Sequence, residues 1–336
     1  MRLFVTGGLG FIGSNFVRHV LEQRPGWSVV NYDLVTYAGN PANLHDLDGT
    51  SGYRFVRGDI ADRSAVAAAL DGCDAVVNFA AESHVDRSIL SAEPFVRTNV
   101  LGTMTLLDAA RTRAGRFLQV STDEVYGALE PDDPPFTETT PLDPTSPYAA
   151  SKAAADHLAL AYARTYGMDV VVTRCSNNYG PYQFPEKLIP LMITNACEGK
   201  PLPVYGDGRQ VRDWIHVEDH CAGVLAALER GKAGEVYNFG GRSERPNLAI
   251  VQRIVELTGA PVSSITHVTD RPAHDRRYGV DPARAERELG WSARHSLDTG
   301  LAQTVAWYRA HEPWWRAIKN GSYRDFYRAW YEERTA

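Results

Sequence analysis

Two side chains near the middle of the chain have the types and spacing of a proton-transfer pair. Tyr148 and Lys152 are four positions apart, so on a helix they share one face and lie about 6 Å apart. A free tyrosine has a pKa of about 10, and a nearby ammonium favours the phenolate that a base requires. Such pairs are common in helices, so the meaning of this one depends on the elements around it.

A second group of reactive side chains, Thr122, Asp123 and Glu124, directly follows a predicted strand. Two adjacent carboxyl groups can act as an acid and a base on neighbouring atoms of one substrate. The alternative is a solvated or helix-capping acidic pair. Because ligands of parallel α/β sheets bind beyond the carboxyl ends of the strands, the position favours acid–base chemistry.

A glycine-rich turn near the N-terminus has the form of a dinucleotide site. Gly7, Gly10 and Gly13 lie between a predicted strand and a predicted helix, where glycine lets the backbone approach a pyrophosphate at the helix N-terminus. Asp33 ends the second strand, twenty positions beyond Gly13. An acid there accepts hydrogen bonds from a ribose 2′-hydroxyl and repels a 2′-phosphate, so NAD is favoured over NADP. Asp59 follows the third strand and either reaches the adenine or caps the next helix.

The elements that position these groups alternate between strand and helix. The sequence predicts strands at 3–6, 27–32, 53–57, 74–80, 116–121 and 169–174, with helices at 13–23, 62–70, 94–113 and 148–166. This alternation predicts an α/β fold with a doubly wound parallel sheet of the Rossmann type. Beyond Cys175, glycine and proline break the chain into short elements, and the strand pair 214–217 and 235–239 is expected to rejoin the sheet.

This reading divides the chain into two parts. Residues 1–174 form the expected NAD-binding domain, which 213–240 rejoins, and residues 175–212 and 241–336 form a smaller lobe, to which the family resemblance described below assigns the binding of a nucleotide sugar. The aromatic residues from Trp314 to Tyr331 are expected to pack the tail onto the body. The proline-rich segment 127–147 is too long for a mere connector and is a candidate for closing the site.

Composition excludes several classes of protein. The 336 residues are 44% hydrophobic and 23% charged, as in a soluble globular protein, and the net charge of −6 provides no basic field for nucleic acid. No apolar run approaches the length of a membrane span, and no secretory signal is expected. The four cysteines are widely spaced, so reduced thiols in a cytoplasmic protein are expected, without disulfides or a metal site.

Several longer motifs resemble those of a known family. The glycine turn and the YxxxK pair are similar to the extended short-chain dehydrogenase/reductase superfamily, and the motifs at 81–88, 121–127, 177–188, 212–220 and 270–278 resemble those of dTDP-glucose 4,6-dehydratases. Related epimerases and decarboxylases share the Tyr/Lys pair but usually lack the Asp-Glu doublet. Asp123 is therefore the residue that separates a dehydratase from these alternatives, and intact Tyr148 and Lys152 argue against a non-catalytic NAD sensor.

The resemblance implies a role for each reactive side chain. Tyr148 would be the base at the sugar 4-hydroxyl, and Lys152 would hold the nicotinamide ribose and tune Tyr148. Thr122 would bond the hexose near C4, Asp123 would be the acid at the C6 hydroxyl, and Glu124 would be the base at C5. Oxidation at C4 makes C5–H acidic, water then leaves across C5–C6, and hydride returns to C6.

The resemblance also implies the binding residues and the oligomer. The NAD site would comprise Gly7, Gly10, Phe11, Ile12, Gly13, Asp33, Leu34, Thr36, Asp59, Ile60, Ala80, Ala81, Ser83, Thr98, Tyr148, Lys152 and Asn178. The dTDP-glucose site would comprise Ser83, His84, Thr122, Asn177, Glu186, Lys187, Leu188, Pro203, Tyr205, Arg212, Asn247, Arg271, His274 and Tyr278. A homodimer through the helices 94–113 and 147–166 is expected, since both carry apolar residues on more than one face.

Overall fold

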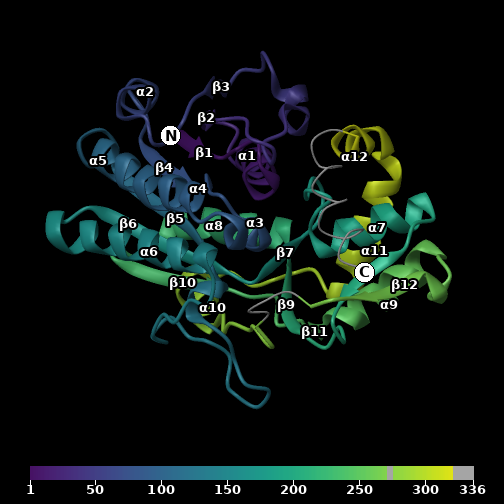
Figure 1. Cartoon of the computed structure of the whole chain (residues 1–336). Coiled ribbons are helices and arrows are strands. Elements are labelled where there is room, and N and C mark those ends of the chain that lie inside the picture. Colours follow the sequence, from purple (N-terminus) through teal and green to yellow (C-terminus); the bar gives the residue numbers. More distant parts are fainter. Residues whose placement is uncertain (271–274, 321–336) are drawn as a thin grey trace.

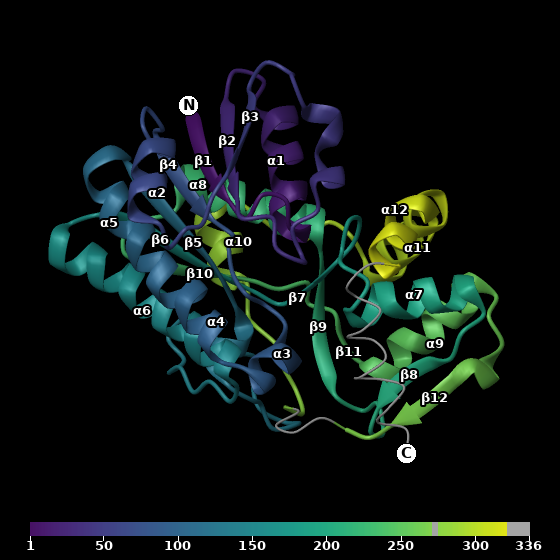
Figure 2. The ribbon, with the colours of Figure 1, turned by 45° about the horizontal axis from the view of Figure 1, so that its top comes forward.

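A seven-stranded parallel sheet forms the larger part of the molecule in the computed structural model, which describes residues 1–270 and 275–320. The strand order is β10-β6-β5-β4-β1-β2-β3, as in a doubly wound fold (Figures 1 and 2). The Rossmann-type sheet predicted from the alternation is thus confirmed. Its strands are β1 (Arg2–Thr6), β2 (Ser28–Asp33), β3 (Tyr53–Arg57), β4 (Ala75–Asn78), β5 (Arg116–Thr122), β6 (Asp169–Cys175) and β10 (Glu235–Phe239).

Helices cover both faces of this sheet because its strands are apolar on both sides. Leu3 and Val5 of β1 pack in one core cluster, whereas Phe4 packs in the other. The first face carries α1 (Phe11–Gln23), α8 (Val217–Arg230) and α10 (Ala283–Leu289), and the second carries α2 (Arg63–Ala69), α5 (Thr103–Arg113) and α6 (Pro147–Tyr166).

The smaller lobe has its own core, with Tyr179, Trp214 and Trp315 among its large buried side chains. Its sheets are β11-β9-β7 and β12-β8. The strand expected at 214–217 is β9, and it pairs with β7 and β11 instead of rejoining the large sheet, whereas β10 does pair with β6. The elements are β7 (Asn177–Tyr179), α7 (Leu188–Glu198), β8 (Leu202–Tyr205), β9 (Val211–His216), β11 (Glu244–Pro246), α9 (Asn247–Thr258), β12 (Ile265–Val268), α11 (Leu297–Ala310) and α12 (Glu312–Lys319).

The helix predicted at 94–113 is confirmed, but its first half is not a regular α-helix. The chain is helical without a break through α4 (Glu93–Phe95), a π-helical segment (Val96–Gly102) and α5, and the short helix α3 (Val85–Leu90) precedes them. In the π-helical segment, buried Asn99 donates to the Glu82 carbonyl at 3.0 Å and to Ser151 Oγ at 2.8 Å. These bonds, which depend on distant partners, tie the loop after β4 to α6.

The aromatic end of the chain packs onto the body as far as the structure describes it. Trp315 is buried, and its indole donates to the Tyr308 carbonyl at 2.8 Å. The Trp314 indole donates to Asn43 Oδ1 at 2.9 Å, which joins α12 to the loop after β2. Tyr323, Phe326, Tyr327, Trp330 and Tyr331 lie outside the described residues. In the described part of the chain, no helix is long and apolar enough to span a membrane.

Candidate active site

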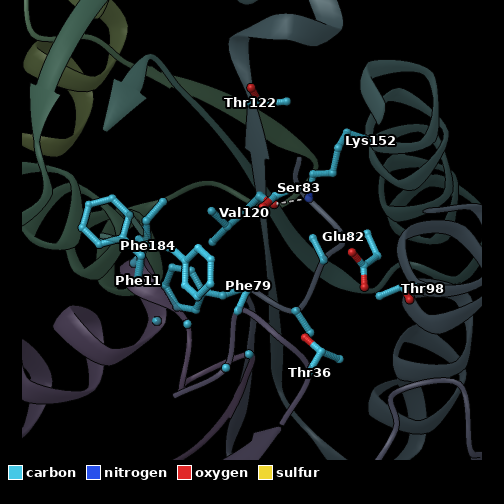
Figure 3. Close-up of a pocket in the computed structure, with 18 of the residues that line it drawn as sticks. Phe11, Thr36, Phe79, Glu82, Ser83, Thr98, Val120, Thr122, Lys152 and Phe184 are labelled. Carbon is cyan, nitrogen blue, oxygen red and sulfur yellow. Dashed lines mark hydrogen bonds between the residues drawn. The ribbon is translucent and has the colours of Figure 1, made fainter. Parts of the chain in front are cut away.

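A cavity of about 330 Å³ opens at the carboxyl ends of β1, β2, β4, β5 and β6. Figure 3 shows the rings of Phe11, Phe79 and Phe184 on one side and Lys152 on the other. Every residue predicted for NAD lines this cavity, from Gly7 in the first turn to Asn178 beyond β6. The structure therefore brings together in one place the NAD residues that the family resemblance implied.

The glycine turn owes its shape to two positions without a Cβ. Gly7 has φ +68°, and a Cβ there would lie 2.6 Å from the Ala80 nitrogen. At Gly13 a Cβ would lie 2.2 Å from the Gly7 carbonyl oxygen. Helix α1 consequently starts tight against the turn, no side chain caps it, and its first residues face the cavity. An uncapped helix N-terminus at a cavity wall suits an anionic ligand.

Two acids stand at the ends of β2 and β3. Asp33 accepts from Leu9 N at 3.0 Å and Val35 N at 2.8 Å, yet burial raises its pKa more than these bonds lower it. Asp59 accepts from Ala61 N at 2.8 Å and pairs with Arg97 at 2.6 Å. The alternative that Asp59 caps the next helix is wrong, because Asp62 caps α2.

Tyr148 and Lys152 lie on the first turns of α6, which begins at Pro147 after the Ser146 cap. Lys152 Nζ donates to the Val120 carbonyl at 2.7 Å (Figure 3). Burial is the main cause that raises the pKa of Tyr148 well above its usual value, and the neighbouring Glu124 adds to it. The phenol is therefore neutral here, so it needs additional positive charge in the cavity to become a base.

The surroundings of Asp123 favour the neutral form of its carboxyl group. Only 2% of it is exposed, and burial, followed by the charges of Glu124 and Asp213, raises its pKa well above the usual value. Thr122 Oγ1 donates to Asp123 Oδ1 at 3.3 Å, while Oδ2 has no hydrogen-bond partner. A carboxylic acid with a free oxygen at a cavity wall can donate a proton to a bound molecule.

The predicted sugar-nucleotide residues fall into three groups. Ser83, Thr122, Asn177, Glu186 and Lys187 line the cavity, and Lys187 Nζ donates to the Ser83 carbonyl at 3.2 Å. His84, Leu188, Pro203, Tyr205, Arg212, Asn247 and Tyr278 are not among the residues lining it. Arg271 and His274 lie outside the described residues.

Arg212 nevertheless lies close to the reactive end of the cavity. Its guanidinium stacks over the Tyr278 ring at 4.3 Å and donates to the Asp275 carbonyl at 3.0 Å. Its charge lowers the pKa of Asp123, although burial and the two neighbouring acids dominate.

The proline-rich segment 127–147 is not the closure that its length suggested. Leu129 N donates to the Arg277 carbonyl at 3.0 Å, Phe136 N donates to the Gly279 carbonyl at 2.9 Å, and no residue of the segment lines the cavity. The segment packs against 277–280 instead, which its sequence composition alone did not reveal.

Sequence reasoning missed several cavity residues. Five of them lie next to predicted residues at the ends of strands, so the expected sheet topology could have predicted them: Phe79, Val120, Ser121, Cys175 and Ser176. The others are Tyr32, Ala38, Gly39, Gly58, Glu82, Gln183 and Phe184, of which the last two lie inside the 177–188 motif.

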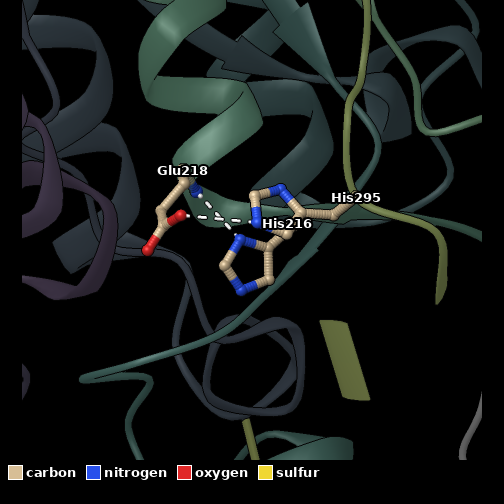
Figure 4. A group of neighbouring side chains, drawn as sticks. All are labelled: His216, Glu218 and His295. Atoms are coloured by element: carbon tan, nitrogen blue, oxygen red, sulfur yellow. Dashed lines mark hydrogen bonds and ion pairs between the residues drawn. The ribbon is translucent and has the colours of Figure 1, made fainter. Parts of the chain in front are cut away.

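A separate histidine pair stands at the start of α8. One potential metal-ligand atom from each of His216, Glu218 and His295 lies within 4.8 Å of the other two (Figure 4). The two imidazole rings are stacked, with centroids 4.2 Å apart and planes at 30°, so their lone pairs do not converge on one point. His216 Nδ1 accepts from Glu218 N at 3.4 Å, which explains the group as a helix cap with an ion pair.

Comparison with known proteins places this geometry in a family. The family model described as GDP-mannose 4,6 dehydratase matches residues 4–304. The chain is 52% identical to a dTDP-glucose 4,6-dehydratase of Xanthomonas campestris over 95% of this chain and 96% of that protein. It is also 52% identical to the dTDP-glucose 4,6-dehydratase DesIV of Streptomyces venezuelae, solved with NAD bound, at a TM-score of 0.92 over 95% of this chain and all of that one.

More distant structures share the fold with another activity. A UDP-glucose 4-epimerase of Thermotoga maritima is 29% identical, with a TM-score of 0.86 over 92% of this chain and 99% of that one. The fold alone therefore does not separate the activities, but the identity across the full chain does. The chain belongs to the GDP-mannose 4,6 dehydratase family and, within it, to the dTDP-glucose 4,6-dehydratases.

Proposed function

We propose that the protein dehydrates dTDP-glucose to dTDP-4-keto-6-deoxyglucose. The observation that carries this proposal is Asp123, a buried acid whose pKa is raised by burial and which lies next to Glu124 in the same cavity as Tyr148. An epimerase or decarboxylase needs the Tyr/Lys pair but has no use for an acid that protonates a leaving hydroxyl. Relatives named for the dehydratase at 52% identity support the same activity.

The cavity fits NAD, which supplies a hydride acceptor when bound. Along one wall of the cavity, the glycine turn and the uncapped start of α1 would bind the pyrophosphate, and the carboxylate of Asp33 would bind the adenosine ribose. We assign Lys152 and Asn178 to the nicotinamide end, opposite Asp33. The solved structure of the Streptomyces relative contains NAD, which supports this assignment.

The chain's own residues then divide the proton transfers. Tyr148 takes the proton of the C4 hydroxyl once the added positive charge lowers its pKa, and Thr122 orients that hydroxyl. Glu124 removes the C5 proton, which becomes acidic when C4 is a ketone. Asp123 donates its proton to the leaving C6 hydroxyl, so a molecule of water departs across C5–C6. Lys152 and Asn178 would hold the hydride acceptor beside the sugar, so that the hydride lost from C4 is supplied to C6, and Glu124 would return a proton to C5, so that atoms balance.

Asp33 is expected to select NAD over NADP. Asp33→Ala should raise the dissociation constant of NAD by about tenfold, since it removes an acceptor for ribose hydroxyls and the two backbone bonds that shape the turn. Calorimetric titration with NAD and NADP measures both effects. Unaltered protein that binds the two dinucleotides equally would contradict the assignment.

An isotope experiment tests the complete reaction. With dTDP-glucose deuterated at C4, we expect the label in the C6 methyl group of the product, with no net consumption of NAD. With unlabelled substrate in heavy water, one deuterium should enter at C5, because Glu124 exchanges its proton with solvent. Mass and NMR spectra locate the label. Label kept at C4 with inverted configuration would show an epimerase instead.

The state of the protein in the cell is also proposed. We infer a homodimer through the region of α3, the π-helical segment and α6, where Leu90, Val96 and Leu101 are exposed apolar residues. Exposed apolar patches of this kind mark contact surfaces. We infer a cytoplasmic location from the four cysteines, all of which are free thiols.

A further inference from the structure

His220 lies on α8, directly behind the inner wall of the cavity. Its exposed fraction is 0%, and its ring packs against Phe239 of β10 with centroids 6.1 Å apart. His220 Nδ1 lies 2.9 Å from Asn178 Oδ1, and Asn178 is one of the residues that line the cavity. The imidazole thus contacts a wall residue without reaching the cavity itself.

The surrounding hydrogen bonds determine which nitrogen of His220 carries the proton. Asn178 Nδ2 donates to the Ser176 carbonyl at 3.0 Å and to Cys175 Sγ at 3.3 Å, so Asn178 Oδ1 must be the atom facing His220. An oxygen accepts, and therefore Nδ1 is the donor and Nε2 is bare, buried and without a partner. Burial lowers the pKa of His220 to about 3, which favours the neutral ring as the donor.

The residues that Asn178 holds form the wall facing Tyr148 and Lys152. Cys175 is paired in register with Thr122, and its Sγ donates to the Ser121 carbonyl at 3.5 Å. Asn178 is also held from the opposite side, because Gln183 Nε2 donates to its carbonyl at 2.9 Å. The amide of Asn178 is therefore the link that fixes the segment from Cys175, at the end of β6, to Asn178 of β7 beside the reacting end of the site.

We propose that His220 is a positioning residue, which acts through Asn178 to hold the Cys175–Asn178 segment, where β6 passes into β7, in the arrangement that the nicotinamide end requires. This inference rests on the proposed function and adds a residue that does not line the cavity. A histidine suits the task because its neutral ring donates from Nδ1 to the amide oxygen and so keeps the amide in one orientation. A lysine there would place a charge in an apolar core.

Paired substitutions separate positioning from packing. His220→Leu removes the donor but fills the space, so kcat should fall by about tenfold and the dissociation constant of NAD should rise by a similar factor. The KM for dTDP-glucose should change little, because His220 is hydrogen-bonded to Asn178, which is assigned to the nicotinamide end. His220→Asn places a neutral amide donor where Nδ1 lies and should restore most of the kcat. Equal losses in both variants, or full kcat in the leucine variant, would overturn the proposal.

A double-mutant cycle with Asn178→Ala supplies a second readout. If His220 acts through Asn178, His220→Leu should lower kcat no further in the Asn178→Ala background, whereas independent effects would multiply. Multiplying effects would reject the proposal even if one variant folds less well. His216→Leu is the matched control: it also removes a buried imidazole near the start of α8, but one that does not contact the cavity wall, so kcat should stay unchanged.

The measurement of NAD binding keeps the two proposals apart. If the unaltered protein fails to convert dTDP-glucose, the proposed function fails. Calorimetry with NAD alone on the same variants still shows whether His220 supports the nicotinamide end. An NAD affinity that is the same in the unaltered, leucine and asparagine proteins would reject the positioning role by itself.

Discussion

Asp123→Asn should lower the formation of dehydrated product by about 10²-fold or more, the usual scale of acid–base assistance. The asparagine has the shape of the protonated acid but has no proton to give to the leaving C6 hydroxyl. Oxidation at C4 depends on Tyr148 and Thr122, which remain. We therefore expect the reaction to stop after the oxidation at C4, so that the absorbance of the reduced cofactor builds up.

Two further variants make this result specific. Glu124→Gln should also stall after oxidation, because the C5 proton then has no base. Glu138→Gln is the matched control: Glu138 is a partly buried acid whose pKa is likewise raised by burial, but it accepts from Asn238 N away from the cavity. Full dehydratase activity in both doublet variants would mean that Asp123 and Glu124 are structural.

The stability of Asp123→Asn distinguishes a chemical loss from a folding defect. Burial already disfavours the ionised carboxyl of Asp123, so a neutral amide costs little and the Tm should not fall. A lower Tm together with lost activity would point to a structural role instead.

The parts of the fold that could be predicted are those that depend on local sequence patterns. The glycine turn, the apolar strands and the Asp62 cap depend on neighbours a few residues away, and the structure places each where the pattern indicated. The prediction that Tyr148 and Lys152 share one face required only that this segment be a helix. Because parallel strands end at the same edge of the sheet, these local features were enough to assemble the cavity.

The parts that could not be predicted depend on distant partners. The π-helical segment holds Asn99 against Glu82 and Ser151, and neither contact is visible in the local sequence. The segment 127–147 has the composition of a mobile closure, but its backbone bonds to 277–280 fix it elsewhere. The interaction of His220 with Asn178 joins residues 42 positions apart, on a helix and a strand end.

Asp156→Asn is expected to produce the largest loss of stability, about 3–5 kcal/mol of unfolding free energy. Asp156 Oδ2 accepts from Arg174 Nε at 2.9 Å, and the two side chains are 0% and 4% exposed. Removing the carboxylate leaves a buried guanidinium without its counter-charge, stacked over the Tyr126 ring at 4.8 Å. Chemical denaturation followed by fluorescence measures the change.

Asp169→Asn provides the matched control for this pair. Asp169 bonds Arg116 at the same 2.9 Å, but the side chains are 36% and 22% exposed, so water replaces the lost partner and the cost should stay below about 1 kcal/mol. Equal losses in the two variants would contradict the view that burial, not distance, sets the effect.

Asp156→Asn should also change the pH dependence of catalysis. Burial lowers the pKa of Lys152, and the charge of Asp156 opposes that shift. Without the carboxylate, the pKa of Lys152 falls further, so its ammonium loses the proton at a lower pH than in the unaltered protein. Since Lys152 must be charged to favour the Tyr148 phenolate, the alkaline limb of the kcat profile should move to lower pH. An alkaline limb that stays in place while stability falls would confine Asp156 to a structural role.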